Sequence, residues 1–455
     1  MADGRHSAPR GRANRVDEAK KAASANQLRL IALGDAVDQR TGAKPRGQRP
    51  PRARHRRRTV LISGVVVVAL LAALVGGGYL YAQWRFNQIH RFNVAGEANR
   101  ISGQPFNILS IGSDSRAGLS GPVAAQTGAS TGSVAGQRSD VVKIMHVDPA
   151  TKTITILSIP RDTMTTLLAN QSLYGSFNRI NVNYGSGPSL LAQTITANFG
   201  IVINHVIQVG FGGLINAADA IGGVYLDFKY PSHDPYSGLV VTHPGCQLIT
   251  GFQALAVARS RHFYYNVNGK AYWPGNNASY SELTNLGWNY DGSSDFGRID
   301  RQNAFLRAMI SRVKSLYNPL SINAFLSKIP QGVTLDSKFS FGELFGLALR
   351  FHNFNPATMK TYTLPTVSGV DPNVGDVLFV DQPSAQQMLV SIFGSSLLKP
   401  TNPPPNSALQ TPMPPVIVPS TTSTLKTNHP PQHPTTTTTN PTLAVPSFDP
   451  VPCKP

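Results

Sequence analysis

The sequence predicts an α/β fold, namely a layered α-β-α sandwich around a central mixed sheet, preceded by one transmembrane helix. An uncharged run of 22 residues extends from Val60 to Tyr81. Between about residues 100 and 395, short apolar strands alternate with segments of helical periodicity, which is typical of a sheet covered by helices. These roughly 290 residues are enough to bury the core of one such domain.

The apolar run would form a helix roughly 33 Å long, about the thickness of the hydrocarbon core of a bilayer. A buried helix of a soluble protein rarely reaches this length without a polar face. A cleaved signal peptide would have a shorter charged region and a small-x-small cleavage site, and no convincing site of this kind follows Tyr81. We therefore predict a transmembrane helix at residues 59–82.

Basic residues predict the orientation of this helix. Five arginines between Arg52 and Arg58 precede it, whereas only Arg85 and Arg91 follow it closely. The positive-inside rule then places the N-terminus in the cytoplasm and everything after about residue 83 outside, with the protein in the cell membrane.

Residues 1–58 hold sixteen Lys or Arg against five Asp or Glu, and we predict a disordered cytoplasmic segment. Such a segment could bind nucleic acid or anionic lipid, and the membrane helix that follows favours membrane lipids, so no nucleic-acid partner is expected. Simple solvation of this segment and a specific partner site both stay open.

The rest of the chain divides by composition. A juxtamembrane linker is predicted at 83–103, an extracytoplasmic catalytic domain at 104–395 and a disordered tail at 396–455. Thr or Pro make up 27 of residues 401–455, a composition that cannot build a core and suits a spacer through the cell wall. Cys246 and Cys453 are the only cysteines. Outside the cell they could form a disulfide, and the sequence leaves the paired and unpaired states open.

Apolar runs and periodicity place the elements of the domain. The predicted strands are Phe106–Ile111, Val141–Val147, Thr153–Ile159 and Val224–Phe228. Asp148 to Lys152 supplies turn residues between the second and third strands, which predicts a hairpin. The predicted helices are Ser189–Phe199, Gly213–Ile221, Gly251–Arg259, Ile299–Val313 and Phe341–Phe351.

Arginine and aspartate gather at five places where these elements begin or end. The clusters are Asp114-Ser115-Arg116, Arg138-Ser139-Asp140, Pro160-Arg161-Asp162, Arg259-Ser260-Arg261, and Asp295-Phe296-Gly297-Arg298 continuing into Asp300-Arg301-Gln302. Each cluster alone is typical of a surface ion pair. Five of them beside strand ends, where open α/β sheets bind ligands, indicate a site.

The chemistry that suits this set is phosphate binding, because guanidinium groups match phosphate oxygens with two parallel hydrogen bonds. Aspartates cannot bind phosphate directly. They suggest a divalent cation, typically Mg²⁺, that bridges carboxylate and phosphate, or a group that accepts the proton of an attacking hydroxyl. An aspartate could also simply orient the neighbouring arginine, which we favour for Asp162. The chain has no Gly-Lys-Ser/Thr phosphate loop, no Gly-x-Ser-x-Gly elbow and no His-Glu-x-x-His pair, and a structural or surface role is favoured for His205, His243 and His262.

The sequence resembles the LytR-CpsA-Psr (LCP) family of bacterial envelope proteins. The resemblance covers about residues 104–310 and rests, in order, on FNILSIGSDSR, RSDVVKIMHVD, SIPRDT, FNRINVNYG, GFGGLINAADAIGGV, GCQLITGFQALAVARSRH and DFGRIDRQ. It implies a membrane-anchored phosphotransferase. The donor would be a polyprenyl-pyrophosphate-linked glycan and the acceptor a hydroxyl of peptidoglycan, with polyprenyl phosphate released.

The resemblance also implies roles for residues. Asp114 and Asp140 match magnesium ligands, and pyrophosphate or head-group contacts fall on Arg138, Arg161, Arg259, Arg261, Arg298 and Gln302. Arg116 and Arg179 match basic motif positions, and Asp295 opens the DFGR motif. We therefore predict one Mg²⁺ ion on Asp114 and Asp140, with Arg116, Arg179, Asp295 and Gln302 as substrate-binding residues. The predicted catalytic set is Asp114, Arg138, Asp140, Arg161, Arg259, Arg261 and Arg298.

The chain departs from the family pattern in two places. A Gly-, Ser- and Thr-rich loop of about two dozen residues separates Asp114 from Asp140, where the family has a shorter loop. An insert at about 263–294 with Trp273 and Trp288 divides the double arginine from DFGR. This insert could form a lid or a sugar-binding rim, or a loop packed by its own aromatic side chains.

Two alternative functions stay open. In a pyrophosphatase acting on the same donor, water would replace the wall hydroxyl. In a non-catalytic wall-binding or regulatory protein, the site would bind without turnover. The Ala- and Arg-rich composition and the Pro/Thr tail suggest an actinobacterial wall, which makes an arabinogalactan-like polymer the expected glycan.

Overall fold

The computed structural model describes residues 13–40, 53–115, 139–314, 319–405 and 448–454, together with residues 119, 124 and 127. The chain forms two compact units, Met1–Gly77 and Gly78–Pro455. Arg116 and Arg138, and the loop that contains them, lie outside the described residues, apart from the three single positions.

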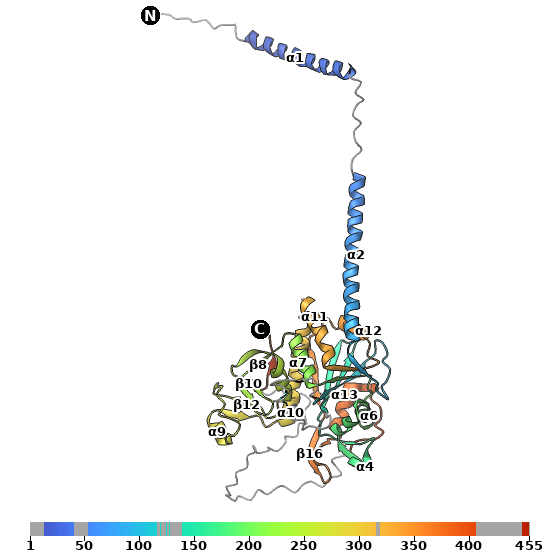
Figure 1. The fold of residues 1–455 in the computed structure, drawn as a ribbon, viewed down its shortest axis with the longest axis vertical. Helices are drawn as coiled ribbons and strands as arrows, with labels where there is room; N and C mark the ends of the chain where they lie inside the picture. The colour runs from blue at the N-terminus through green and yellow to red at the C-terminus, as the bar shows by residue number, and fades with distance from the viewer. Residues whose placement is uncertain are drawn as a thin grey trace, which may run out of the picture. The chain divides into compact units, whose positions relative to one another are not determined.

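Two helices occupy the N-terminal part of the chain, α1 (Ala13–Arg40) and α2 (Ala53–Phe86) (Figure 1). The prediction of a disordered segment at 1–58 is therefore wrong for α1, because Ala, Leu, Lys, Arg and Gln dominate its sequence and favour a helix. Residues Val60–Phe86 of α2 are long and apolar enough to cross a membrane. This agrees with the one membrane helix predicted from the sequence.

A seven-stranded mixed sheet forms the centre of the larger unit. In spatial order its strands are β1 (His90–Phe92), β14 (Val333–Asp336), β7 (His205–Val209), β2 (Phe106–Ser113), β3 (Ser139–Asp148), β4 (Thr153–Ile159) and β15 (Lys360–Thr363). The pairs β1–β14, β2–β7 and β4–β15 are parallel and the other three are antiparallel. The central mixed sheet is thus confirmed.

Helices cover both faces of this sheet. On one face, Leu109 and Ile144 pack with side chains of α6 (Pro188–Phe199) and α13 (Ser384–Phe393). On the other, Ile108 and Ile156 pack toward α10 (Ser294–Lys314) and α12 (Phe341–Arg350). Successive strand residues point to opposite faces, so each face buries its own apolar set and the α-β-α layering follows.

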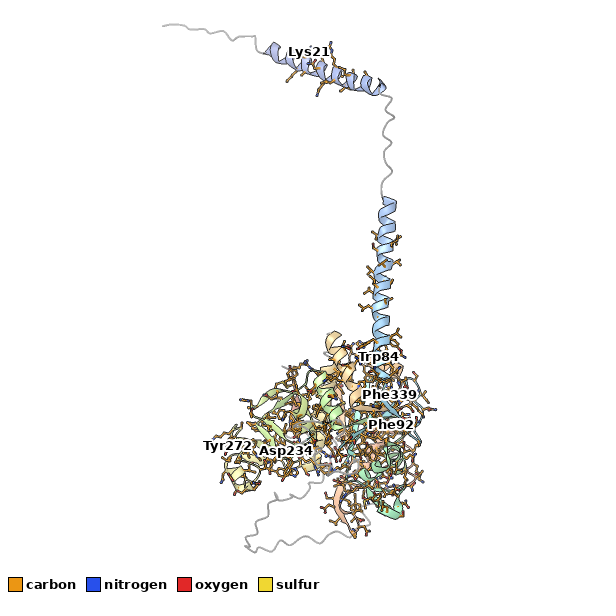
Figure 2. The ribbon with its side chains drawn as sticks, in the orientation of Figure 1. Lys21, Trp84, Phe92, Asp234, Tyr272 and Phe339 are labelled. Carbon is orange, nitrogen blue, oxygen red and sulfur yellow. A yellow bond between two sulfur atoms is a disulfide. The ribbon has the colours of Figure 1, made fainter. Side chains whose placement is uncertain are left out.

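A second core lies beside the sheet. It joins α7 (Phe211–Ala220), α8 (Gly251–Arg259) and α10 to β8 (Val224–Phe228), β10 (Leu239–Val241) and β11 (Gly245–Ile249) (Figure 1). Strands β9 (Ser232–Asp234), β10, β12 (Tyr264–Asn266) and β13 (Trp288–Tyr290) form a four-stranded sheet. Much of the insert packs on itself through Tyr264, Leu283 and Trp288, so it has an aromatic core of its own. Tyr272, labelled in Figure 2, is 68% exposed.

Smaller elements complete the unit. They are β5 (Met164–Thr166), α4 (Gln171–Tyr174), β6 (Phe177–Arg179), α5 (Ile180–Asn183), α9 (Tyr280–Asn285), α11 (Pro319–Lys328), β16 (Thr366–Asp371) and β17 (Gly375–Val380). Strands β5 and β6 pair with each other, as do β16 and β17.

The segment predicted as a juxtamembrane linker is part of the folded domain. Phe86 is buried and packs with Phe341, which Tyr79 also contacts edge-on. The Tyr81 hydroxyl donates to Asn323 on α11, and β1 pairs with β14. Aromatic burial and strand pairing order this segment, so the linker assignment for 83–103 is corrected.

Both described ends of the predicted tail are ordered as well. The Leu398 amide donates to the carbonyl of Gly200, and β18 (Val451–Pro452) pairs with β8. A disulfide joins Cys246 to Cys453, and Phe448 stacks on Tyr265 with ring centroids 4.6 Å apart. Residues 396–405 and 448–454 therefore belong to the domain, and 406–447 lie outside the described residues.

Candidate functional site

Asp140 lies at a bulge where β2 ends and β3 begins. Gly112 pairs with Val141 and Ser113 pairs with Ser139, so Asp140 has no partner of its own in the register of β2. A Cβ on Gly112 would lie 2.7 Å from the Cβ of Val141, which explains glycine at this close approach. Bulges of this kind re-aim side chains at sheet edges and near functional sites.

Arg161 follows the end of β4 and meets the carboxylate at this bulge. Pro160 has no N–H and ends the strand ladder, and Nη1 of Arg161 then lies 2.6 Å from Oδ1 of Asp140. Burial opposes the arginine charge, but the carboxylates of Asp140, Asp162 and Asp295 outweigh it, and the pKa of Arg161 is raised. Asp162 lies 3.4 Å from Nε of Arg161, and the orienting role expected for it stays a prediction.

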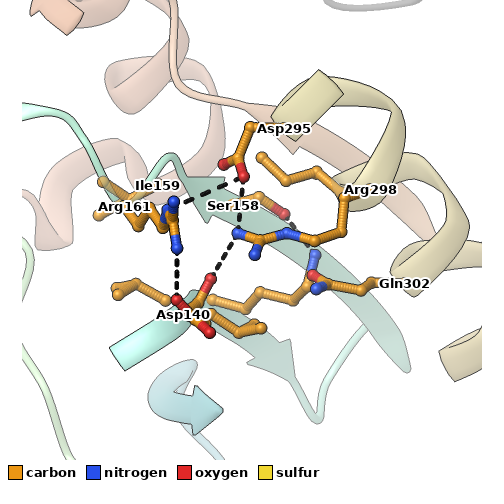
Figure 3. Close-up of a pocket in the computed structure, with 11 residues that line it drawn as sticks. Asp140, Ser158, Ile159, Arg161, Asp295, Arg298 and Gln302 are labelled. Carbon is orange, nitrogen blue, oxygen red and sulfur yellow. Dashed lines mark hydrogen bonds and ion pairs between the residues drawn. The ribbon is translucent and has the colours of Figure 1, made fainter. Parts of the chain in front are cut away.

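Asp295, in the first turn of α10, is the centre of the charge cluster (Figure 3). Its Oδ1 lies 2.9 Å from Arg298, 3.3 Å from Arg261 and 4.0 Å from Arg161. Arg298 also donates to the backbone carbonyl of Asp140, at 2.7 Å. Burial lowers the pKa of Arg298, and Asp295 and Asp140 partly offset this. One carboxylate thus gathers three arginines from three separate chain segments.

The turn that carries Arg259 and Arg261 is fixed by a carboxylate that the sequence analysis missed. Asp234, fully buried and labelled in Figure 2, accepts hydrogen bonds from the amides of Tyr236, Ser237, Arg261 and His262 and from the Ser260 hydroxyl. A carboxylate with this many donors stabilises one backbone conformation. Asp234 therefore positions the double arginine although it stands outside every motif.

A second buried cluster lies beside the first on α10. Arg301 is fully buried, and Nη1 lies 2.8 Å from Asp291 and 2.6 Å from Asp449 of the C-terminal segment. A Cβ on Gly297 would lie 2.8 Å from Nη2 of Arg301 and 1.9 Å from Oγ of Ser293. The glycine of DFGR is thus required by the packing of Arg301 behind the site.

The charges surround a small pocket of about 10 Å³, roughly the space of one water molecule, lined by Asp140, Arg161, Asp295, Arg298, Gln302 and Lys143 among others (Figure 3). This is far below the roughly 300–1,000 Å³ of sites that enclose a whole small molecule. Buried Lys143 donates to Ser158 and Asn303, and burial lowers the pKa of Lys143 to about 7. A lysine inside the apolar run VVKIMHV was the sequence signal for this residue.

The other predicted residues fall in several places. Gln302 lines the pocket and donates to the carbonyl of Ala258, and the guanidinium of Arg259 lies 4.9 Å from the Phe211 ring centroid. Arg179 donates to the carbonyls of Asp376 and Val374 at the β16–β17 turn, and lies 3.8 Å from Asp162. Its substrate-binding role stays a prediction.

Asp114 directly follows β2, whose last residue pairs with Ser139. Asp114 and Asp140 therefore lie beside the same pair of strand ends. Carboxylate oxygens are the ligands that Mg²⁺ prefers, and the side chain of Asp140 is 26% exposed, so this donor set fits a hard cation. The predicted Mg²⁺ site stays a prediction.

Comparison with known proteins gives a consistent result. The chain matches the LytR_cpsA_psr family over residues 82–266 and 288–392, and the gap between these ranges falls in the insert. It is 29% identical over 318 residues to the probable cell wall biosynthesis protein LcpB of Corynebacterium glutamicum, covering 69% of this chain and 67% of that protein.

A second relative is the polyisoprenyl-teichoic acid–peptidoglycan teichoic acid transferase TagV of Bacillus subtilis. It is 27% identical over 291 residues, which cover 63% of this chain and 62% of TagV. Among solved structures, the LytR-Csp2A-Psr enzyme from Actinomyces oris has the same fold, with a TM-score of 0.50 at 20% identity over 70% of this chain and 99% of that one.

Proposed function

The chain belongs to the LytR-CpsA-Psr family, and from this premise we propose that it transfers a phosphorylated glycan from a polyprenyl-pyrophosphate carrier to a hydroxyl of peptidoglycan. The relative named as a teichoic acid–peptidoglycan transferase supports a transferase of this type. The membrane helix supports a lipid-linked donor, because it would hold the domain at the bilayer surface. We infer an extracytoplasmic domain from the arginines that precede this helix.

The observation that carries the proposal is the grouping of Arg161, Arg261 and Arg298 around Asp295 at the pocket. Asp140 and Asp162 also pair with Arg161, so three carboxylates accompany the three guanidinium groups. The arginines would bind a pyrophosphate through paired hydrogen bonds, and Mg²⁺ on the aspartates would offset the added negative charge.

In the proposed reaction, the acceptor hydroxyl attacks the phosphorus nearer the sugar. A phosphorus–oxygen bond to the wall forms, the hydroxyl proton passes to an aspartate carboxylate of the site, the bond to the bridging oxygen breaks, and polyprenyl phosphate leaves. The arginines orient the pyrophosphate and stabilise the charge that develops on its oxygens, which is the main contribution of protein to phosphoryl transfer. When bound on Asp114 and Asp140, Mg²⁺ would add further neutralisation of this charge.

The test uses the purified full-length chain in detergent, a synthetic polyprenyl-pyrophosphate-linked saccharide and peptidoglycan. We expect a new saccharide–phosphate–peptidoglycan linkage by mass spectrometry, lost on chelation of Mg²⁺. An arabinogalactan-like saccharide is the first donor to try. Release of free saccharide phosphate without a linkage would instead identify a hydrolase, and binding of the donor without turnover would identify a non-catalytic protein.

Arg161→Ala should lower the transfer rate by about 10²–10³-fold, the usual effect of removing one group that stabilises transition-state charge. Arg350→Ala is the matched control, since this arginine is exposed on α12 and should transfer at the wild-type rate. A wild-type rate in Arg161→Ala would contradict the proposed role of the cluster.

A further inference from the structure

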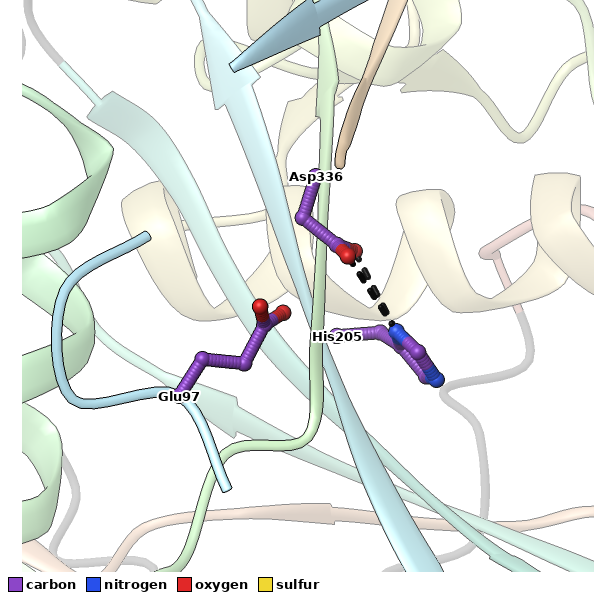
Figure 4. Close-up of side chains that lie close together, drawn as sticks. All are labelled: Glu97, His205 and Asp336. Atoms are coloured by element: carbon purple, nitrogen blue, oxygen red, sulfur yellow. Dashed lines mark hydrogen bonds and ion pairs between the residues drawn. The ribbon is translucent and has the colours of Figure 1, made fainter. Parts of the chain in front are cut away.

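A second group of ionisable side chains lies at the opposite end of the sheet from the arginines. His205 begins β7, Asp336 ends β14, and Glu97 follows β1 (Figure 4). All three are buried, with exposed fractions of 8% for Glu97, 2% for His205 and 0% for Asp336. One ligand atom from each lies within 4.8 Å of the others.

Two of these side chains are held firmly. Asp336 accepts hydrogen bonds from the amides of Val206 and Phe339, and both of its oxygens lie 3.3 Å from Nδ1 of His205. The ring of Phe339 stacks on the imidazole at a centroid distance of 4.5 Å. The imidazole and the carboxylate are therefore oriented before any ligand arrives.

Glu97 is the unsatisfied member of the group. Neither of its carboxylate oxygens accepts a hydrogen bond from any residue that the structure describes, although the side chain is more than nine-tenths buried. Lys338 is nearby, but its Nζ donates to the backbone carbonyl of Glu97 and to Asn99. Burial raises the pKa of the Glu97 carboxyl to about 8, and the charge of Asp336 acts in the same direction, as does a hydrogen bond with the Asp336 side chain that forms only when one of the two carboxyls is protonated. A buried carboxylate without a partner is costly and calls for a compensating cation or proton.

We propose that Glu97, His205 and Asp336 bind one Zn²⁺ ion. Imidazole nitrogen and carboxylate oxygen are both ligands of this cation, whereas Mg²⁺ and Ca²⁺ favour oxygen ligands alone. The 3.3 Å between Nδ1 of His205 and the Asp336 oxygens is close to the roughly 3.3–3.4 Å that separates two ligands of tetrahedral zinc at bond lengths of about 2.0–2.1 Å. A water molecule would complete the coordination.

The ion would link three segments of the chain, because its ligands come from β7, β14 and the segment that follows β1. That segment continues from the end of α2, so zinc would fasten the membrane-proximal chain to the sheet. Val209, at the far end of β7, pairs with Gly112 beside the arginine site. Four residues of strand, roughly 13 Å, thus separate the two ends of β7. The zinc site is independent of the proposed transfer activity.

Other charged side chains lie close to Glu97, His205 and Asp336, and one of them provides a control variant. Arg91 donates to the backbone carbonyl of Asp336, and Glu343, paired with Arg100 at 3.6 Å, lies 3.8 Å from Nε2 of His205. The side chain of Glu343 is 28% exposed and caps α12 with Ser340. Glutamine preserves that cap, which makes Glu343→Gln a matched control for Glu97→Gln.

The experiment strips the full-length detergent-solubilised chain of metal, dialyses it against Zn²⁺ in the presence of excess Mg²⁺, and counts bound zinc by mass spectrometry. We expect wild type and Glu343→Gln to bind one more Zn²⁺ per chain than Glu97→Gln. The zinc affinity of this site should be at least about 10–100-fold lower in Glu97→Gln. Losing a residue that only hydrogen-bonds a metal ligand already lowers metal affinity by roughly that factor. Asp140→Asn should keep the site, which separates it from the predicted Mg²⁺ ligands.

Thermal unfolding provides the second measurement. Zn²⁺ should raise the melting temperature of wild type and not that of Glu97→Gln, because a ligand that binds only the folded chain stabilises it. Equal zinc binding by wild type and Glu97→Gln would overturn the proposal. Equal melting temperatures of wild type and Glu97→Gln, both without and with added Zn²⁺, would also overturn it. Glu97 and Asp336 would then share a proton instead of a cation.

Discussion

Arg298 and Arg301 lie three residues apart on α10, yet one lines the pocket and the other is buried behind it. Arg301 is fully buried, pairs with the two carboxylates of Asp291 and Asp449, and has its guanidinium 4.6 Å from the Phe263 ring centroid. Arg298 lines the pocket and shares Asp295 with two further arginines. The first region is closed within its own chain, whereas the second lines a pocket. Access from the pocket, more than the number of arginines, therefore distinguishes site from scaffold.

The largest expected effect comes from a change in the buried region around Arg301. Arg301→Met should lower the free energy of unfolding by about 3–5 kcal/mol, because it leaves two buried carboxylates without a cation. Guanidinium-induced unfolding of the full-length chain measures this. Arg350→Met, on the exposed face of α12, is the control. Equal stability of Arg301→Met and the control would show that the ion pairs of Arg301 with Asp291 and Asp449 contribute nothing to folding.

The matching change on the site side is Arg298→Met. It should slow transfer by about 10²–10³-fold, equivalent to roughly 2.7–4 kcal/mol in the barrier, and destabilise the fold less than Arg301→Met does. Asp295 keeps Arg161 and Arg261 as neighbours in this variant, which explains the smaller effect on stability. Transfer rates and unfolding free energies are measured on the same preparations. A larger loss of stability in Arg298→Met than in Arg301→Met would contradict the assignment of Arg298 to the site.

Asp234→Asn should destabilise the turn that carries Arg261. In this variant an NH₂ group replaces one of the two accepting oxygens and would face N–H or O–H donors. We expect a loss of about 2–3 kcal/mol in unfolding free energy and a higher KM for the lipid-linked donor, because Arg261 is less firmly placed. Asp376→Asn, with an exposed side chain, is the control, and a KM equal to wild type would contradict the positioning role.

The smallest effect concerns pH. Burial raises the pKa of Asp449 to about 6, with Arg301 opposing the shift. A raised carboxyl pKa stabilises the fold at pH values below the unfolded pKa, and this contribution is lost as the pH rises through about 6. Between pH 5 and 7, wild type should therefore lose about 1 kcal/mol of stability relative to Asp449→Asn. Parallel curves for the two proteins would show that Asp449 does not titrate in this range.

The sequence predicts those elements well whose apolar runs are long and local. Strands Thr153–Ile159 and Val224–Phe228 and helix Gly251–Arg259 have the predicted bounds, because each has a clear period and turn residues beside it. Strands β1, β14 and β15 have only three or four residues. Their partners lie far along the chain, so tertiary pairing, which no local pattern records, accounts for their formation.

The same distinction holds for the site. Motif residues such as Arg161, Asp295 and Arg298 are predicted because they cluster in sequence and resemble a family pattern, and the structure brings them together. The sequence could not separate Arg298 from Arg301 within DFGRIDRQ, because the difference depends on Asp449, 148 residues away. Asp234 has no neighbouring motif, and its five hydrogen bonds exist only in the folded turn.

The disulfide between Cys246 and Cys453 has a consequence for proteolysis. Residues 406–447 join two ordered ends, and the disulfide closes this part of the chain into a covalent ring. A protease cut within 406–447 would therefore open the ring without releasing the C-terminal fragment, and Asp449 would stay beside Arg301. A nicked molecule should run as one band without reductant and as two bands with it, so the domain should tolerate clipping until its disulfide is reduced.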